Sequence, residues 1–142
     1  MKKKIIMIFL GLLITVSTYA EIELKEIEKN FFGFSLENIK SEKERIGILE
    51  KKIIGHISDG ILGERKNKLY ELLYNNSKYK SLTLKLSEIE KKILKKQSME
   101  NILTRLENLE LIAYGKINNN DAFIDRIKKI SKYFGMEEKN VY

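Results

Sequence analysis

Four arginines occupy one position of a pattern that recurs along the chain. These arginines, with the lysine at the fifth such position, are Arg45, Arg65, Lys85, Arg105 and Arg126. Most of the 27 basic residues are lysine, so chance alone would rarely place every arginine at the same repeat position. A guanidinium holds five N–H donors in a planar fork that matches a carboxylate or a phosphate, which an ammonium does not. The position is therefore predicted to bind an oxyanion with two hydrogen bonds.

A row of glutamates accompanies the arginines. The repeated acidic positions are Glu28, Glu50, Glu90 and Glu110. Within one repeat the acid follows the base by five residues, which is too far for a pair on one helix, where partners lie three or four residues apart. Pairing between neighbouring helices remains open, so one hypothesis is a ladder of ion pairs that fixes how successive helices dock. The other hypothesis is a row of arginines offered to a polyanion.

The residue types exclude most catalytic and metal-binding chemistry. The 142 residues include no Cys, Trp or Pro and one histidine, His56, which excludes disulfides, a thiol nucleophile and a Cys–His metal site. The sequence has no phosphate-binding glycine loop and no nucleophile elbow. We therefore predict a non-enzymatic protein with no catalytic, cofactor or metal site. A lytic or carbohydrate-active enzyme would need two carboxylates that converge in a pocket.

The apolar residues of each repeat have helical spacing. In the clearest copies they recur at intervals of four, three and four residues, as in Leu82, Leu86, Ile89 and Ile93. That spacing lines one face of an α-helix and cannot line one face of a strand. The leading positions of successive copies are 24, 46, 66, 86, 106 and 127, about 20 residues apart. We predict one helix for each copy.

Turn residues mark where these helices should end and begin. Glycine or asparagine, expected in the left-handed conformation after a helix, stands at Gly33, Gly55, Asn75, Gly115 and Gly135. Side chains expected to cap the next helix are Ser35, Asp59, Ser81, Ser98 and either Asn120 or Asp121. The helices would then have about 13 to 19 residues and be joined by short polar turns. Residues 82–114 could form one bent helix or two.

The repeat predicts an all-α fold. A single amphipathic helix cannot bury its apolar stripe alone, so neighbouring repeats must cover one another. We expect an antiparallel up-and-down helical bundle or a small solenoid of single-helix repeats over residues 21–135. A coiled-coil hairpin or dimer is the alternative, because the spacing also resembles a heptad pattern. The polar residues 136–142 are predicted to form a flexible C-terminal tail.

The first twenty residues have the layout of a secretory signal peptide. Lys2, Lys3 and Lys4 precede an apolar run over residues 5–16, and cleavage is predicted after Ala20. The run is shorter than the roughly 20 apolar residues that span a bilayer, which favours cleavage over an uncleaved membrane anchor. Cleavage removes three lysines and lowers the formal net charge from +7 to +4. The mature chain is expected in the periplasm, on the outer surface or in the medium.

The repeat signature can be written R-[IL]-x-x-[IL]-E-x-x-[ILA]-[FYIL]-G and extends over residues 24–135. It resembles short tandem repeats in uncharacterised exported proteins of Gram-negative bacteria, and this resemblance implies no ligand. We expect an exported interaction protein, adhesin-like or envelope-associated, that binds a protein or an anionic envelope or cell-surface polymer. Self-association is a further option, and nucleic acid is not expected as a partner. The alternative function is a periplasmic chaperone or stress protein that holds unfolded clients.

Overall fold

A computed structural model describes residues 23–75 and 80–136, and within these ranges the regular elements are all α-helices. The helices are α1 (Leu24–Phe32), α2 (Glu42–Ile54), α3 (Leu62–Tyr74), α4 (Leu82–Leu94), α5 (Ile102–Tyr114) and α6 (Phe123–Tyr133). The predicted all-α helical fold is confirmed, with one helix for each copy of the repeat. The predicted signal peptide and residues 137–142 lie outside the described residues.

Most of the helices begin later than their predicted caps. Ser41, Ser81 and Asn101 each accept the backbone N–H three residues later through a side-chain oxygen, and so cap α2, α4 and α5. The cap predicted at Ser81 is confirmed. The caps predicted at Ser35, Asp59, Ser98 and at Asn120 or Asp121 are wrong. These residues lie in the connecting segments, ahead of the extended residue from which the helix starts.

Most helix ends follow the prediction. Positive φ is found, as predicted, at Gly33, Gly55, Gly115 and Gly135. Asn75 ends α3 but has a φ of −146°, so the left-handed conformation predicted for it is wrong. Its backbone N–H still bonds to the carbonyl of Glu71. Lys95 ends α4 with a φ of 59°, and residues 82–114 therefore form two helices, α4 and α5.

Replacing Lys95 by glycine should stabilise the protein. A side chain in the left-handed region costs about 1 kcal/mol relative to glycine, and Lys95 has this conformation. We expect Lys95→Gly to raise the free energy of unfolding by about 0.5 to 1 kcal/mol in urea titrations. This value is reduced by the conformational entropy that glycine adds to the unfolded chain, which opposes the gain. Lys96→Gly, at the next exposed position, is the matched control and should be neutral or destabilising. A less stable Lys95→Gly would contradict the prediction.

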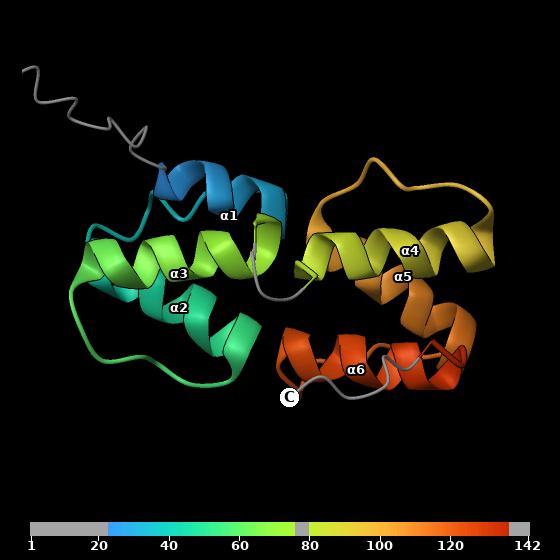
Figure 1. The fold of residues 1–142 in the computed structure, drawn as a ribbon. Helices are drawn as coiled ribbons and strands as arrows, with labels where there is room; N and C mark the ends of the chain where they lie inside the picture. The colour runs from blue at the N-terminus through green and yellow to red at the C-terminus, as the bar shows by residue number, and fades with distance from the viewer. Residues whose placement is uncertain (1–22, 76–79, 137–142) are drawn as a thin grey trace, which may run out of the picture.

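The six helices form two groups of three, α1–α3 and α4–α6, that lie end to end (Figure 1). Within each group the N-terminal ends of the helices lie together, and so do the C-terminal ends. The rings of Tyr114 and Tyr133, at the C-terminal ends of α5 and α6, lie 5.0 Å apart. At the N-terminal ends of α3 and α2, Lys66 Nζ lies 3.8 Å from a carboxylate oxygen of Glu42. Successive helices therefore run in the same direction, as the steps of a single-helix solenoid do, whereas antiparallel neighbours would bring unlike ends together.

The connecting segments are longer than the short turns predicted. A helix of 13 residues is about 20 Å long, and an extended chain needs about six or seven residues to cover that distance. Within each group the connecting segments are residues 33–41, 55–61, 95–101 and 115–122. Their length follows from the direction of the helices, because each segment must return along the helix it leaves.

The two groups meet at a junction where the C-terminal ends of α1–α3 face the N-terminal ends of α4–α6. The rings of Phe31 and Phe123, both fully buried, lie 5.1 Å apart in an edge-on arrangement. Thr83, in the first turn of α4, donates its hydroxyl to the carbonyl of Leu73 in the last turn of α3. Opposite ends of the helix dipoles thus face one another across the junction, which is the favourable orientation.

One apolar core extends through both groups. Buried apolar side chains from all six helices form a single cluster, and they occupy the helical positions that the repeat predicts. Met136, the first residue of the predicted tail, is half-buried and packs against this core. None of the described helices is long and apolar enough to cross a membrane.

Candidate interaction site

The repeated arginines and glutamates pair between successive helices. Each arginine is the fourth residue of its helix, and its Nε and Nη2 donate to the two carboxylate oxygens of a glutamate in the preceding helix. The pairs are Arg45–Glu28, Arg65–Glu50, Arg105–Glu90 and Arg126–Glu110, with N–O distances of 2.6 to 3.0 Å. The predicted ladder of ion pairs is confirmed at these four positions. Its bidentate geometry explains why arginine is used here in a chain rich in lysine.

Each glutamate of the ladder also holds a connecting segment. The glutamate lies five residues before the C-cap residue of its helix. Its Oε2 accepts the backbone N–H of the residue that is eight positions after the glutamate. These donors are Leu36, Ser58, Ser98 and Asn118, at 2.9, 3.1, 3.4 and 3.1 Å. One carboxylate therefore fixes both the return of the chain and the docking of the next helix, which satisfies a charge that the fold has removed from water.

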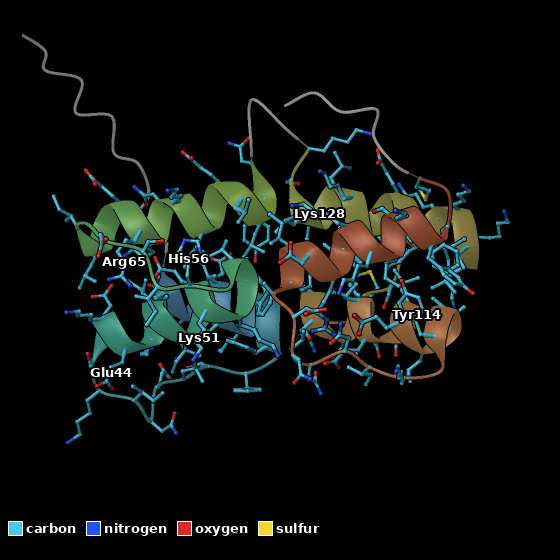
Figure 2. The ribbon with its side chains drawn as sticks, turned by 90° about the horizontal axis from the view of Figure 1, so that it is seen from below. Glu44, Lys51, His56, Arg65, Tyr114 and Lys128 are labelled. Carbon is cyan, nitrogen blue, oxygen red and sulfur yellow. The ribbon has the colours of Figure 1, made fainter. Side chains whose placement is uncertain are left out.

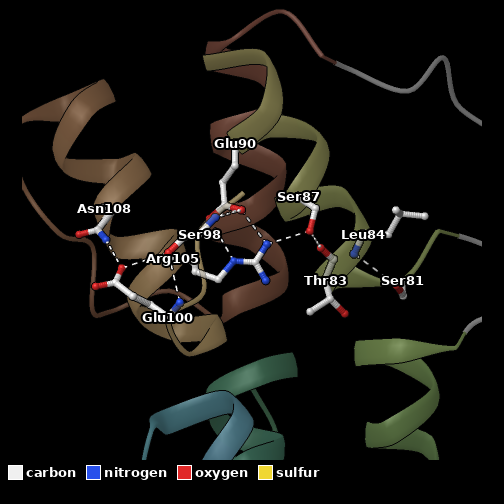
Figure 3. Close-up of polar contacts among 9 residues, drawn as sticks. All are labelled: Ser81, Thr83, Leu84, Ser87, Glu90, Ser98, Glu100, Arg105 and Asn108. Carbon is white, nitrogen blue, oxygen red and sulfur yellow. Dashed lines mark hydrogen bonds and ion pairs between the residues drawn. The ribbon is translucent and has the colours of Figure 1, made fainter. Parts of the chain in front are cut away.

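Figure 3 shows one rung of the ladder at Arg105. Its Nε and Nη2 lie 3.0 and 2.7 Å from the oxygens of Glu90, and Nη2 also donates to Ser87 Oγ at 2.8 Å. Arg105 is 5% exposed and Glu90 is 1% exposed. With its guanidinium bound and buried, Arg105 has the arrangement of the first hypothesis and not that of an arginine offered to a polyanion.

The ladder has no such rung between α3 and α4. Lys85 occupies the arginine position of α4, and the glutamate position of α3 holds Tyr70. Both exceptions therefore occur at the same interface, which is the step from one group of three helices to the other (Figure 1). Lys85 is half-buried. The ladder thus ties helices together within each group, while the apolar junction joins the groups.

The rung at Glu50 predicts a dependence of stability on pH. Burial opposes ionisation of Glu50, but the hydrogen bonds from Arg65 and Ser58 outweigh it, and the pKa of Glu50 lies below its ordinary value of 4.5. A carboxyl group with a lowered folded-state pKa stabilises the fold above its unfolded pKa and loses that contribution as the pH falls through the folded value. We therefore expect the thermal midpoint to fall as the pH drops below about 4.5, the ordinary pKa of the carboxyl group. Glu50→Gln should have a lower thermal midpoint than the wild type at about pH 7, and its midpoint should change less as the pH falls. An unchanged slope of the midpoint against pH would contradict this assignment.

A shallow hollow of about 380 Å³ lies beside the junction, and we call it the junction hollow. Its lining residues are Phe32, Ile48, Lys51, Lys52, Gly55, Asn119, Asn120, Asp121 and Ala122. The ring of Phe32 stacks on that of Phe34 with centroids 5.6 Å apart, and Phe34 is 58% exposed. Apolar side chains thus lie beside two lysines from α2 and a polar segment that precedes α6. Figure 2 places Lys51 between the two ends of the molecule, which are marked by Glu44 and Tyr114.

The ladder positions both sides of the junction hollow. Glu110 binds the backbone of Asn118, directly before the segment 119–122 that forms one side. Glu50 binds Arg65 and Ser58, and it lies in the same turn of α2 as Lys51 and Lys52 on the other side. Both sides of the hollow therefore lie next to residues that the glutamates of the ladder hold by hydrogen bonds.

In the part of the chain that the structure describes, the histidine and the carboxylates are not gathered into a metal site. His56 is exposed in the segment that follows α2. Within residues 23–75 and 80–136, no three His, Asp or Glu side chains are placed to hold a metal ion together. The repeat glutamates 28, 50, 90 and 110 are bound to arginine.

Sequence reasoning missed the junction hollow. The available signal was the run of three phenylalanines, Phe31, Phe32 and Phe34, at the end of α1. The repeat explains Phe31, which is buried, but not an exposed aromatic residue at position 34. The opposite side of the hollow is formed by residues 119–122, far away in the sequence, and no repeat spacing connects the two. Comparison of the chain with protein-family models, curated proteins and solved structures gives no match.

Proposed function

We propose that the protein is an exported, non-enzymatic interaction protein, adhesin-like or envelope-associated, that binds its partner at the junction hollow. The observation that carries the binding role is the exposed ring of Phe34, stacked on Phe32 beside Lys51 and Lys52. Phe32 packs partly against the core, but a ring as exposed as that of Phe34 gains little for the fold by staying in water, and aromatic residues are enriched at the centres of interfaces. Support for export comes from the layout of residues 1–20.

The partner that fits this hollow carries an apolar group next to an anionic one. Phe32 and Ile48 of the lining, with Phe34 stacked on Phe32, offer the apolar contact, and Lys51 and Lys52 offer positive charge. These lysines lie in the last turn of α2, where they also offset the negative end of the helix dipole, so their charge alone does not indicate a ligand. The feature that indicates a ligand is the aromatic pair of Phe32 and Phe34 next to these two lysines. Envelope proteins and anionic cell-surface polymers are partners with this chemistry that an exported chain meets.

A binding comparison tests this proposal. The processed protein is immobilised, and the amount of each envelope component that it retains is measured for the wild type, Phe34→Asp and Ile112→Asp. Ile112, in α5, is the matched control because it is 52% exposed and lies outside the hollow. Loss of an aromatic anchor costs about 2 kcal/mol, so Phe34→Asp should bind roughly thirtyfold more weakly while Ile112→Asp binds normally. Equal retention by Phe34→Asp and the wild type would reject the hollow as the binding site.

The apolar lining also favours a second candidate function, a periplasmic chaperone that holds unfolded clients. The same variants distinguish it from a dedicated interaction protein. A chaperone should suppress the aggregation of several unrelated unfolded proteins, and Phe34→Asp should lose that effect. Selective retention of one envelope component, with no effect on aggregation, would favour the first candidate.

Export is tested separately by cell fractionation with N-terminal sequencing. We expect a mature protein that begins at Glu21, outside the cytoplasm. Full-length protein in the cytosol would reject the export part of the proposal and leave the binding part to be tested with cytosolic partners.

A further inference from the structure

The two ends of the molecule carry opposite charge. The N-terminal ends of α1–α3 form what we call the acidic end, over residues 23–26, 41–44 and 61–64. Five exposed glutamates and two lysines lie in these segments, and the glutamates are Glu23, Glu26, Glu42, Glu44 and Glu64. The C-terminal ends of α4–α6 form the basic end, over residues 91–96, 111–117 and 132–136. These described segments contain no carboxylate side chain and six exposed lysines, which are Lys91, Lys92, Lys95, Lys96, Lys116 and Lys132.

The basic end also exposes a connected aromatic surface. The rings of Tyr114 and Tyr133 lie 5.0 Å apart, and Phe134 lies 5.0 Å from Tyr133. Lys92 of α4 donates to the carbonyl of Phe134 at 2.9 Å, which joins the ends of α4 and α6. Tyr114 is 40% exposed and Tyr133 is 55% exposed. The end of the α4–α6 group is therefore an aromatic surface surrounded by lysines.

The acidic end offers a complementary apolar side chain. Ile61 is the N-cap residue of α3 and is 70% exposed. An isoleucine gives no capping hydrogen bond, and none is made by its side chain, so neither capping nor burial explains its presence there. Glutamates lie in the first turns of α2 and α3, at the same end of the group as Ile61. An aromatic surface with lysines around it is the kind of surface that this end would fit.

The junction inside the molecule already joins helix ends in this way. There the C-terminal ends of α1–α3 lie against the N-terminal ends of α4–α6, with Phe31 and Phe123 in contact (Figure 1). The same two kinds of end remain at the outside of the molecule, because all helices of a group run in one direction. A second copy is the partner that presents the missing end, with opposite side-chain charges and the opposite ends of the helix dipoles.

We infer that the protein associates with copies of itself head to tail, the acidic end of one copy against the basic end of the next. The contact joins two different surfaces, so each added copy leaves one end of each kind free, and the product is an open filament. The surfaces involved lie away from the junction hollow. The inference goes beyond the proposed function and does not rest on it, since filaments can form whether or not the hollow binds a partner.

Sedimentation of charge-reversal variants tests this inference with the processed protein. The acidic-end variant is Glu44→Lys with Glu64→Lys, and the basic-end variant is Lys91→Glu with Lys96→Glu. All four side chains are exposed, so the variants should fold, which circular dichroism checks. The matched control is Glu71→Lys with Asp125→Lys, which makes the same charge change as the acidic-end variant at exposed positions away from both ends.

Wild type and control should gain mass with rising protein concentration, and more so at low than at high salt, because salt screens exposed charges. Each end variant alone should need a much higher protein concentration than the wild type to associate, because the charge difference between its two ends is smaller or reversed. An equimolar mixture of the two should form a 1:1 dimer and nothing larger, because the acidic-end variant keeps a normal basic end and the basic-end variant keeps a normal acidic end. A mixture that stays monomeric, an acidic-end variant that still associates through two basic ends, or a wild type that is monomeric at every concentration and salt would each overturn the inference.

Discussion

Replacing Arg126 by alanine should remove a large part of the stability of the protein. Arg126 is 1% exposed and holds both carboxylate oxygens of Glu110, which is also 1% exposed. The substitution leaves a charged carboxylate buried without its cation, and breaking a buried pair in this way costs about 3 to 5 kcal/mol. A domain of this size has about 5 to 15 kcal/mol in total. Glu110 would also hold the backbone of Asn118 less firmly, which loosens the segment beside the junction hollow.

The measurement is a urea titration of Arg126→Ala against Lys128→Ala. Lys128 lies two residues away, has a 60% exposed side chain and pairs with Asp125 at the surface, so its loss should cost less than about 0.5 kcal/mol. Arg126→Met combined with Glu110→Leu should recover much of the stability, because neither charge is then buried alone. Nη1 of Arg126 has no hydrogen-bond partner within the described chain, which adds to the expected recovery. Equal stability of Arg126→Ala and Lys128→Ala would contradict the structural role of the ladder.

Replacing Phe123 by alanine should have a comparable effect through packing alone. Phe123 is fully buried at the start of α6, and its ring meets that of Phe31 across the junction. Truncation of a buried phenylalanine to alanine costs about 3 to 5 kcal/mol, through the lost transfer free energy and the cavity that remains. The cavity would lie where no rung of the ladder joins the groups, so we expect the two groups to lose their mutual packing first.

Two measurements check this prediction. The free energy of unfolding of Phe123→Ala is compared with that of Phe34→Ala, which removes a ring that is 58% exposed and should cost less than about 1 kcal/mol. Amide hydrogen exchange then reports where the chain opens. Faster exchange at the helix ends that face the junction, with the helix interiors still protected, is expected. Uniform loss of protection over both groups would mean that the junction does not open separately.

The features of the fold that could be predicted from the sequence are those that depend on the spacing of residues within one helix. The four-three-four spacing gives a helix wherever it occurs, as in Leu82, Leu86 and Ile89, because it depends on the geometry of one helix alone. The ladder was predictable for a related reason. All four arginines stood at one repeat position, and a planar fork placed at regular intervals beside a row of glutamates has few alternatives.

The errors at helix termini have a different origin. Ser98 was predicted as a cap because it is the first capping residue after α4, yet its backbone binds Glu90 and the helix starts only after Asn101. Lys95 lacks the glycine signature of a helix end but adopts a φ of 59°. In both cases a contact beyond the local segment decides the backbone, since the chain must return along α4 to dock α5. Short-range propensity contains no information about that return.

The sequence by itself determined the helical character of each repeat, the apolar face of each helix and the regular placement of arginine and glutamate that made an ion-pair ladder one of two hypotheses. Each of these depends on residues within one repeat or on the step to the next. Only the tertiary structure decided that the helices of a group run in the same direction, that two groups meet end to end at Phe31 and Phe123, and that Phe32 lines a hollow with residues 119–122. Those features join segments up to about 90 residues apart, and they arise because each helix must cover the apolar stripe of another. A periodic sequence specifies the stripe, whereas the packing of all six helices together selects what covers it.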